Sequence, residues 1–159
     1  MREILFRGKR EDDGKWVYGY YGEFHNRPLV DGPNICQIFE PCEIESKLFN
    51  SMIGGIWHHI DRETVGQFTG LTDKNGTKIF EGDIVKLTEK NDKYEWVAVV
   101  EFGNPNSYYS WGWQLKPITK NVEYNLDILC WVDIDDFGVY CEVIGNIYDN
   151  PELLKGGAE

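Results

Sequence analysis

Three side chains that can bind a metal ion or move a proton lie within four residues, at His58, His59 and Asp61. Histidine is the commonest metal ligand and a general base near neutral pH, and a carboxylate can support either role. Neighbouring residues of a strand point to opposite faces, so His59 and Asp61 can share a face that His58 does not reach. The sequence supplies only one further histidine, His25. We interpret the cluster as structural or surface residues and keep a small hydrolase as an alternative.

Two further acids, Glu81 and Asp83, lie two residues apart. A pair of carboxylates can hydrolyse a glycosidic bond or hold a metal ion, but only at a separation that a sequence does not give. Because Asp in turns commonly accepts backbone hydrogen bonds, we interpret both as turn residues. A third acidic group lacks the loop pattern of an EF-hand and indicates a solvated loop. It consists of Asp133, Asp135 and Asp136.

Large aromatic side chains gather in the segment 108–113. Rings presented by a strand can stack nucleobases or prolines. The same alternation also serves core and cross-strand packing, which is the more common use. As a hypothesis, we predict a binding surface here, formed by Tyr108, Tyr109, Trp111 and Trp113.

The four cysteines are Cys36, Cys42, Cys130 and Cys141. The residues between them number five in the first pair and ten in the second, which matches neither a zinc ribbon nor a redox pair. We interpret them as reduced, partly buried thiols, with a zinc site of four thiolates as the alternative. We therefore expect no cofactor.

The chain carries a net charge of −11, which disfavours a phosphate-binding surface. A local basic patch at Arg7, Lys9, Arg10 and Lys15 is interpreted as the solvated tip of a hairpin. No apolar run approaches the roughly 20 residues of a membrane-spanning helix, and the first ten residues lack the apolar region of a signal peptide. We expect a cytoplasmic protein that does not enter a membrane.

Turn signals recur along the chain and define the elements that carry these residues. A hairpin is expected near the N-terminus around Asp13-Gly14, with Trp16, Tyr18 and Tyr20 on one face of its second strand. Apolar residues at 44, 48 and 52 predict a short helix over 42–55. Strands are expected at 35–39, 55–60, 84–88, 95–102, 108–116 and 139–148, the last with a bend at Gly145. One helical turn should follow at 150–154.

Backbone geometry explains the glycines of the middle segment, VGQFTGLTDKNGTKIFEGDIV. Asn75-Gly76 predicts a two-residue hairpin turn, and Gly82 and Asp83 predict a second tight turn. The spacing of the turns favours an all-β, mainly antiparallel fold. We expect an N-terminal hairpin and variable connector over 1–64 and a small β-barrel over 65–154, both within one compact unit, followed by a loose tail at 155–159.

Three segments, MREILFRG…WVYGYY, DRETVGQFTGLTDKNGTKIFEGDIV and VIGNIYDNPELL, resemble the YopX-like proteins of bacteriophages and prophages of Gram-positive bacteria. The resemblance runs from residue 1 to about 154. It implies a phage or prophage protein of the bacterial cytoplasm, with a barrel of SH3-like character in the second half. It implies no activity and no catalytic residues, since its shared positions are turn residues and core apolars.

We therefore predict a non-enzymatic module that binds a host or phage protein, with self-association as a further prediction. A β-barrel that associates with nucleic acid is the first alternative, although the acidic balance opposes it. The small hydrolase is the second alternative.

Overall fold

The computed structural model describes residues 4–24, 35–44, 52–89, 95–103, 111–118, 126–128 and 139–155. Within these ranges the regular structure is β-strand, apart from the short 3-10 helices η1 (Arg62–Thr64) and η3 (Pro151–Lys155). The strands pair antiparallel. The chain divides into two compact units, unit 1 (Met1–Gln67) and unit 2 (Phe68–Glu159). The predicted all-β, antiparallel class is confirmed.

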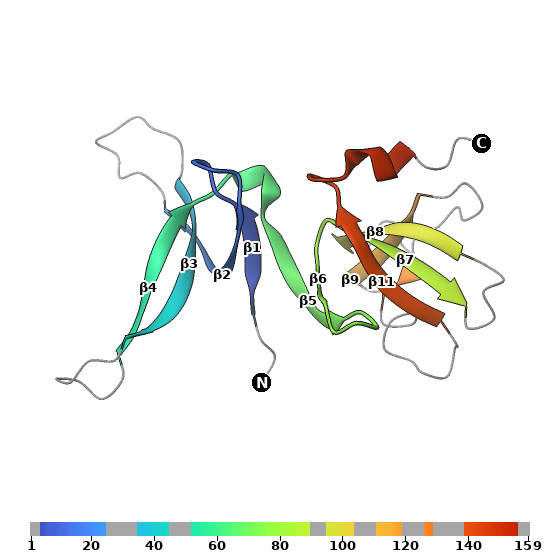
Figure 1. Ribbon diagram of the computed structural model, residues 1–159, viewed down its shortest axis with the longest axis horizontal. Helices are drawn as coiled ribbons and strands as arrows, with labels where there is room; N and C mark the ends of the chain where they lie inside the picture. The colour runs from blue at the N-terminus through green and yellow to red at the C-terminus, as the bar shows by residue number, and fades with distance from the viewer. Residues whose placement is uncertain are drawn as a thin grey trace. The chain divides into compact units, whose positions relative to one another are not determined.

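Unit 1 is built from β1 (Phe6–Lys9), β2 (Trp16–Phe24), β3 (Ile35–Ile44) and β4 (Met52–His59) (Figure 1). The strands follow the order β4-β3-β2-β1, and β5 (Gly66–Thr72) continues the order beyond β1. The helix predicted over 42–55 is wrong in its described parts, because Ile44 pairs with Met52 across β3 and β4. Cross-strand pairing here overrides the helical spacing of the apolar residues. The middle of that segment, 45–51, lies outside the described residues.

The sheet of unit 1 curls around a small core (Figure 1). Its inner face buries Val17, Cys36, Ile38 and Ile60. Arg10 forms an isolated antiparallel bridge with Ile60, so β1 and the end of β4 meet at one corner. The Asp61 N–H donates to the carbonyl of Lys9 at 2.8 Å, and the Glu11 N–H donates to the carbonyl of His59 at 3.1 Å. Because side chains alternate along a strand, the residues next to these buried ones direct their side chains to the outer face of the sheet.

Strand β5 changes its partner along its length. Gln67 pairs with Phe6 of β1, whereas Phe68 and Thr72 pair with β6 (Lys78–Phe80). The turn between β5 and β6 is one residue longer than predicted, because the Gly76 N–H donates to the carbonyl of Asp73 and the Asp73 N–H donates to that of Thr77. Gly76 has φ +82°, which explains the glycine.

The main sheet of unit 2 has the order β10-β9-β8-β7-β11. Its strands are β7 (Asp83–Glu89), β8 (Glu95–Gly103), β9 (Gly112–Pro117), β10 (Leu126–Asp127) and β11 (Val139–Asn146). The barrel expected in this half is corrected to an open sheet. Among the described residues, β10 and β11 are its two edges and do not pair with each other, and β6 pairs with β5 instead.

The bend predicted at Gly145 is confirmed as a register shift between Val143 and Gly145 in the pairing of β11 with β7. The helical turn predicted at 150–154 is present as η3. Among the described residues no helix is long and apolar enough to cross a membrane.

Candidate interaction site

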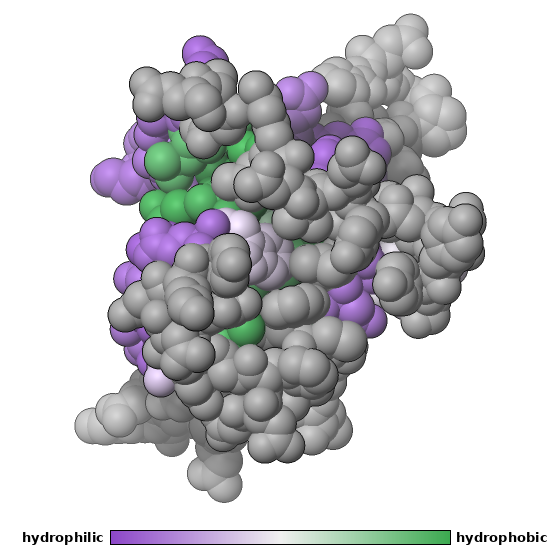
Figure 2. Space-filling model, turned by 90° about the vertical axis from the view of Figure 1, so that its right-hand side faces the viewer, coloured by the Kyte–Doolittle hydropathy of each residue, from purple (hydrophilic) through white to green (hydrophobic). Residues whose placement is uncertain are grey.

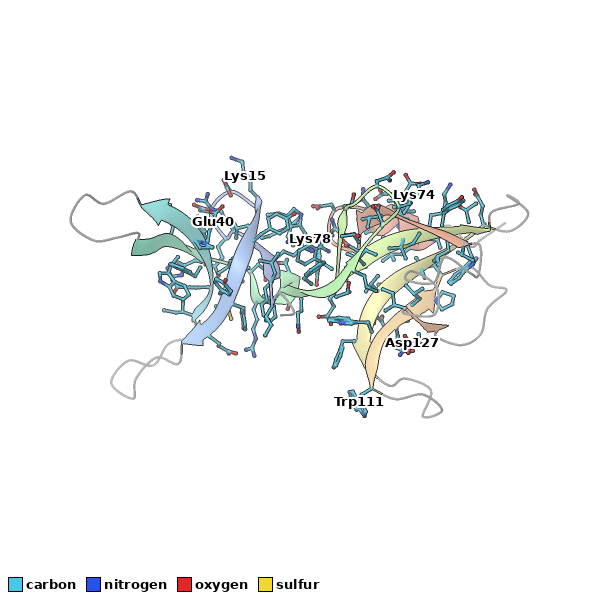
Figure 3. All side chains as sticks on the ribbon, turned by 90° about the horizontal axis from the view of Figure 1, so that it is seen from below. Lys15, Glu40, Lys74, Lys78, Trp111 and Asp127 are labelled. Atoms are coloured by element: carbon cyan, nitrogen blue, oxygen red, sulfur yellow. The ribbon has the colours of Figure 1, made fainter. Side chains whose placement is uncertain are left out.

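The aromatic residues singled out in the sequence divide between core and surface of unit 2. Trp113 is 9% exposed and belongs to the core, whereas Trp111 is 75% exposed and projects away from the sheet (Figure 3). The centroid of the Phe102 ring lies 6.4 Å from that of Trp111 and 4.9 Å from that of Trp113. Tyr108 and Tyr109 lie outside the described residues, and a binding role for this group stays a prediction. On the side drawn in Figure 2, the coloured hydrophobic residues reach the surface in small areas bordered by hydrophilic ones.

The carboxylates considered for hydrolysis stabilise backbone turns. Asp83 is 1% exposed, and its carboxylate accepts a hydrogen bond from the Phe80 N–H at 2.7 Å. Asp61 caps η1 by accepting from the Glu63 N–H at 3.0 Å. Both residues therefore have the local role that the turn chemistry predicts.

The two neighbouring histidines have separate side-chain partners. His58 Nε2 lies 3.0 Å from the Glu40 carboxylate, and His59 Nε2 lies 3.1 Å from Gln37 Nε2. The described residues contain no cluster of three or more His, Cys, Asp or Glu side chains able to hold a metal ion. The acidic cluster at 133–136 lies outside the described residues.

Two thiols, Cys36 and Cys141, are buried and unlinked. Burial raises the pKa of Cys141 to about 12, and the neighbouring carboxylates act in the same direction. Burial, together with the Cys36 contact at 3.5 Å, raises the pKa of Tyr21 to about 12. Both groups therefore stay protonated at neutral pH. The side chains of Cys42 and Cys130 are outside the described part of the chain.

A row of aromatic rings crosses the outer face of unit 1. Tyr20 pairs with Phe39, and Phe39 pairs with Trp57, so three adjacent strands each contribute a ring. Tyr18 lies two residues before Tyr20 on the same face, and Trp16 two residues before that. Tyr18 is 46%, Tyr20 57% and Trp57 47% exposed. We refer to these five side chains as the aromatic face.

A glycine in β4 leaves room for one ring of the aromatic face. The Phe39 and Trp57 ring centroids lie 5.0 Å apart, with the planes tilted by 47°. A Cβ added at Gly55 would lie 2.3 Å from the Phe39 ring, so that ring lies directly over the Gly55 backbone. Only glycine leaves room for this approach.

Cations accompany the rings at one end of the aromatic face. The Arg7 guanidinium lies 4.7 Å and the Lys9 ammonium 5.5 Å from the centroid of the Trp16 ring. Arg7 is 6% exposed, which leaves Lys9 as the more accessible charge. On β1 and β2, the described outer-face side chains include no carboxylate, although the chain is strongly acidic.

The other half of the predicted basic patch is neutralised within the turn between β1 and β2. Arg10 binds the Asp12 carboxylate and lies 3.5 Å from that of Asp13, and Lys15 lies 3.2 Å from Asp13. The hydrogen bond that Arg10 donates to the Asp12 carboxylate is the main reason why the pKa of Arg10 is raised. This part of the patch is therefore a solvated hairpin tip, as predicted.

A groove of about 590 Å³ lies beside β4. One side is formed by the turn after β1 and the other by β4. Its lining residues are Arg10, Glu11, Asp12, Ile56, Trp57, His58 and His59. Trp57 belongs to both the groove and the aromatic face. Among these lining residues, His58 Nε2 lies 3.0 Å from the Glu40 carboxylate.

Sequence reasoning found part of the aromatic face and missed the rest. Trp16, Tyr18 and Tyr20 are recognisable from strand periodicity alone. Phe39 and Trp57 join them only through the register of β3 with its two neighbours, for which the sequence holds no local signal.

Comparisons with known proteins agree with this fold. The family model described as YopX protein matches residues 5–155. The crystal structure of protein EF1440 from Enterococcus faecalis is similar, with a TM-score of 0.54 and 21% sequence identity, covering 97% of this chain and 99% of that one. At this identity the likeness concerns the fold alone. The comparison with curated proteins gives no match.

Proposed function

We propose, from the premise that this chain belongs to the YopX family, that it is a non-enzymatic module that binds another protein through the aromatic face of unit 1. The resemblance described above supports a phage- or prophage-encoded protein of the bacterial cytoplasm as its setting. The observation that carries the proposal is the half-exposed row of Tyr18, Tyr20 and Trp57 on one face. Tyrosine and tryptophan are enriched where protein interfaces are most strongly bound, because they combine apolar area with a polar tip.

The charges of unit 1 favour a protein partner over a nucleic acid. Binding to phosphates requires several accessible cations, but Arg7 is buried and Arg10 is engaged by Asp12. A small hydrolase has less support, because Asp83 and Asp61 accept backbone hydrogen bonds.

The test compares three full-length baits in a bacterial host lysate: the wild type, a Tyr20→Ala/Trp57→Ala variant and a Phe102→Ala/Trp111→Ala variant. The Phe102→Ala/Trp111→Ala variant is the matched control, since it removes two exposed rings from unit 2. A partner identified with the wild type is then purified and its affinity measured for each bait. We expect the unit 1 variant to bind at least about tenfold more weakly, as for central aromatic residues of interfaces, and the control to bind like the wild type.

Loss of binding with the control variant alone would move the interaction to the surface around Trp111 and contradict the proposal. Equal binding by all three baits would also contradict it. Thermal unfolding of each bait shows whether the substitutions leave the fold intact.

A further inference from the structure

The peptide groups of β4 alternate between its two sides. The Ile60 N–H donates to the carbonyl of Cys36 at 3.1 Å, so even-numbered residues at this end direct their peptide groups toward β3. Odd-numbered residues then direct theirs to the other side. The carbonyl of His59 confirms this, because it accepts from the Glu11 N–H at 3.1 Å.

The side of β4 that faces away from β3 borders the groove. Among the described strands, β4 lies at the end of the sheet order. The chain itself begins to pair with this side, through the bridge between Arg10 and Ile60 and the hydrogen bond of Glu11. The turn after β1 then departs from β4, and the groove of about 590 Å³ opens where the pairing stops.

We propose that this groove receives an extended segment of a partner polypeptide, which adds to β4 as a further strand and continues the pairing that Glu11 starts. This inference rests on the proposed function and names the form in which the partner binds. A peptide backbone is the ligand that complements alternating N–H and C=O groups. Apolar side chains of the segment would pack on opposite faces of the sheet, one against Ile56, which is 59% exposed, and another against Trp57.

The charges of the groove favour peptide over nucleic acid. Glu11 and Asp12 line one side, and Arg10 is engaged by Asp12. Phosphates would meet these carboxylates, whereas a peptide segment needs no charge at its backbone.

The first experiment selects peptides of about ten residues, a long strand, from a random library on the full chain, and measures their affinity for variants at His59. In His59→Pro the outward N–H is removed while the pairing of β4 with β3 keeps its donors. His59→Ala is the matched control, because it removes the same side chain and keeps the N–H. We expect the proline variant to bind at least about fivefold more weakly than the alanine variant, as for one lost hydrogen bond.

The second experiment uses wild-type protein only and is independent of whether the proline variant folds. Each backbone amide of a selected peptide is methylated in turn. An added strand directs alternate amides toward β4, so affinity should fall at every second position and stay within about threefold of the parent at the others, given that a hydrogen bond contributes about a factor of five.

The outcomes separate this inference from the proposed function. Selection of no peptide, or a methylation pattern without period two, overturns strand addition, while the lysate comparison of ring variants still decides the proposed function. A dimer of the chain that His59→Pro abolishes would assign this edge to a second copy and overturn the inference. Binding of single-stranded oligonucleotides that depends on the His59 N–H would overturn it as well.

Discussion

At the scale of single residues, Asp73 joins the hairpin of β5 and β6 to β11. One carboxylate oxygen accepts from the N–H groups of Asn75 and Thr77, each at 2.8 Å, and the other accepts from that of Val143 at 3.0 Å. Burial raises the pKa of Asp73, but the backbone donors outweigh burial and hold the pKa below its usual value.

Replacement of Asp73 by Asn should lower the free energy of unfolding by about 1–3 kcal/mol at pH 7, because one backbone donor loses a charged acceptor. The pKa is lower in the folded state, so the stabilisation is complete above the unfolded value of about 4 and is lost as the pH falls through the folded value. Urea unfolding at pH 7 and at lower pH should show the difference from wild type shrinking. The surface variant Glu101→Gln should change stability by less than about 0.5 kcal/mol, and a pH-independent effect of Asp73→Asn would contradict the argument.

A second residue-level prediction concerns Cys141, whose pKa burial raises to about 12. Thiolate is the reactive form, so iodoacetamide at pH 8 should label Cys141 slowly in native buffer and fully in concentrated urea. Mass spectrometry of the peptide that contains Cys141 provides the measurement, with glutathione as the reference thiol. Labelling of native Cys141 at the rate of glutathione would show that the thiol is accessible.

At the scale of elements, the bulge at Gly145 depends on the chain that follows it. A Cβ at Gly145 would lie 2.5 Å from Asn150 Oδ1, and this oxygen accepts a hydrogen bond from the Asn146 N–H at 3.3 Å. Gly145→Ala should therefore displace Asn150 and lower the free energy of unfolding by about 1–3 kcal/mol. Gly112→Ala is the control, since a Cβ there meets nothing within 4 Å, and it should change stability by less than about 1 kcal/mol. Equal effects of the two would contradict this account.

The elements also show how far sequence reasoning extends. The positions of turns that contain glycine are predictable from the sequence, and Gly14, Gly76 and Gly82 all have positive φ. These signals are local, because the steric freedom of glycine is a property of one residue. The helix predicted over 42–55 was wrong in its described parts, 42–44 and 52–55, because the pairing of β3 with β4 outweighs a helical spacing of apolar residues. The prediction of a barrel was wrong because strand order is decided by non-local pairing, and Phe39 and Trp57 of the aromatic face were missed for the same reason.

At the scale of the whole molecule, each unit has its own core. Among the described residues, the core cluster of unit 2 contains nine buried residues from Ile79 to Cys141. That of unit 1 contains four buried residues, from Val17 to Ile60. A larger core supports independent folding better than a small one.

We therefore expect residues 68–159 expressed alone to unfold cooperatively in urea, and residues 1–67 alone to be much less stable. Circular dichroism of the two fragments and of the full chain measures this. The full chain should show either two transitions or a transition broader than that of a single domain. A stable fragment 1–67 beside an unfolded fragment 68–159 would reverse the assignment.

Strand β5 has a consequence for how the chain tolerates changes in length. Gln67 is registered against Phe6, and the next residue, Phe68, is registered against Phe80. One residue inserted within either paired part of β5 would turn its later side chains to the opposite face and shift them out of register with the partner strand. Insertions and deletions compatible with these two registers must therefore fall outside the paired parts of β5.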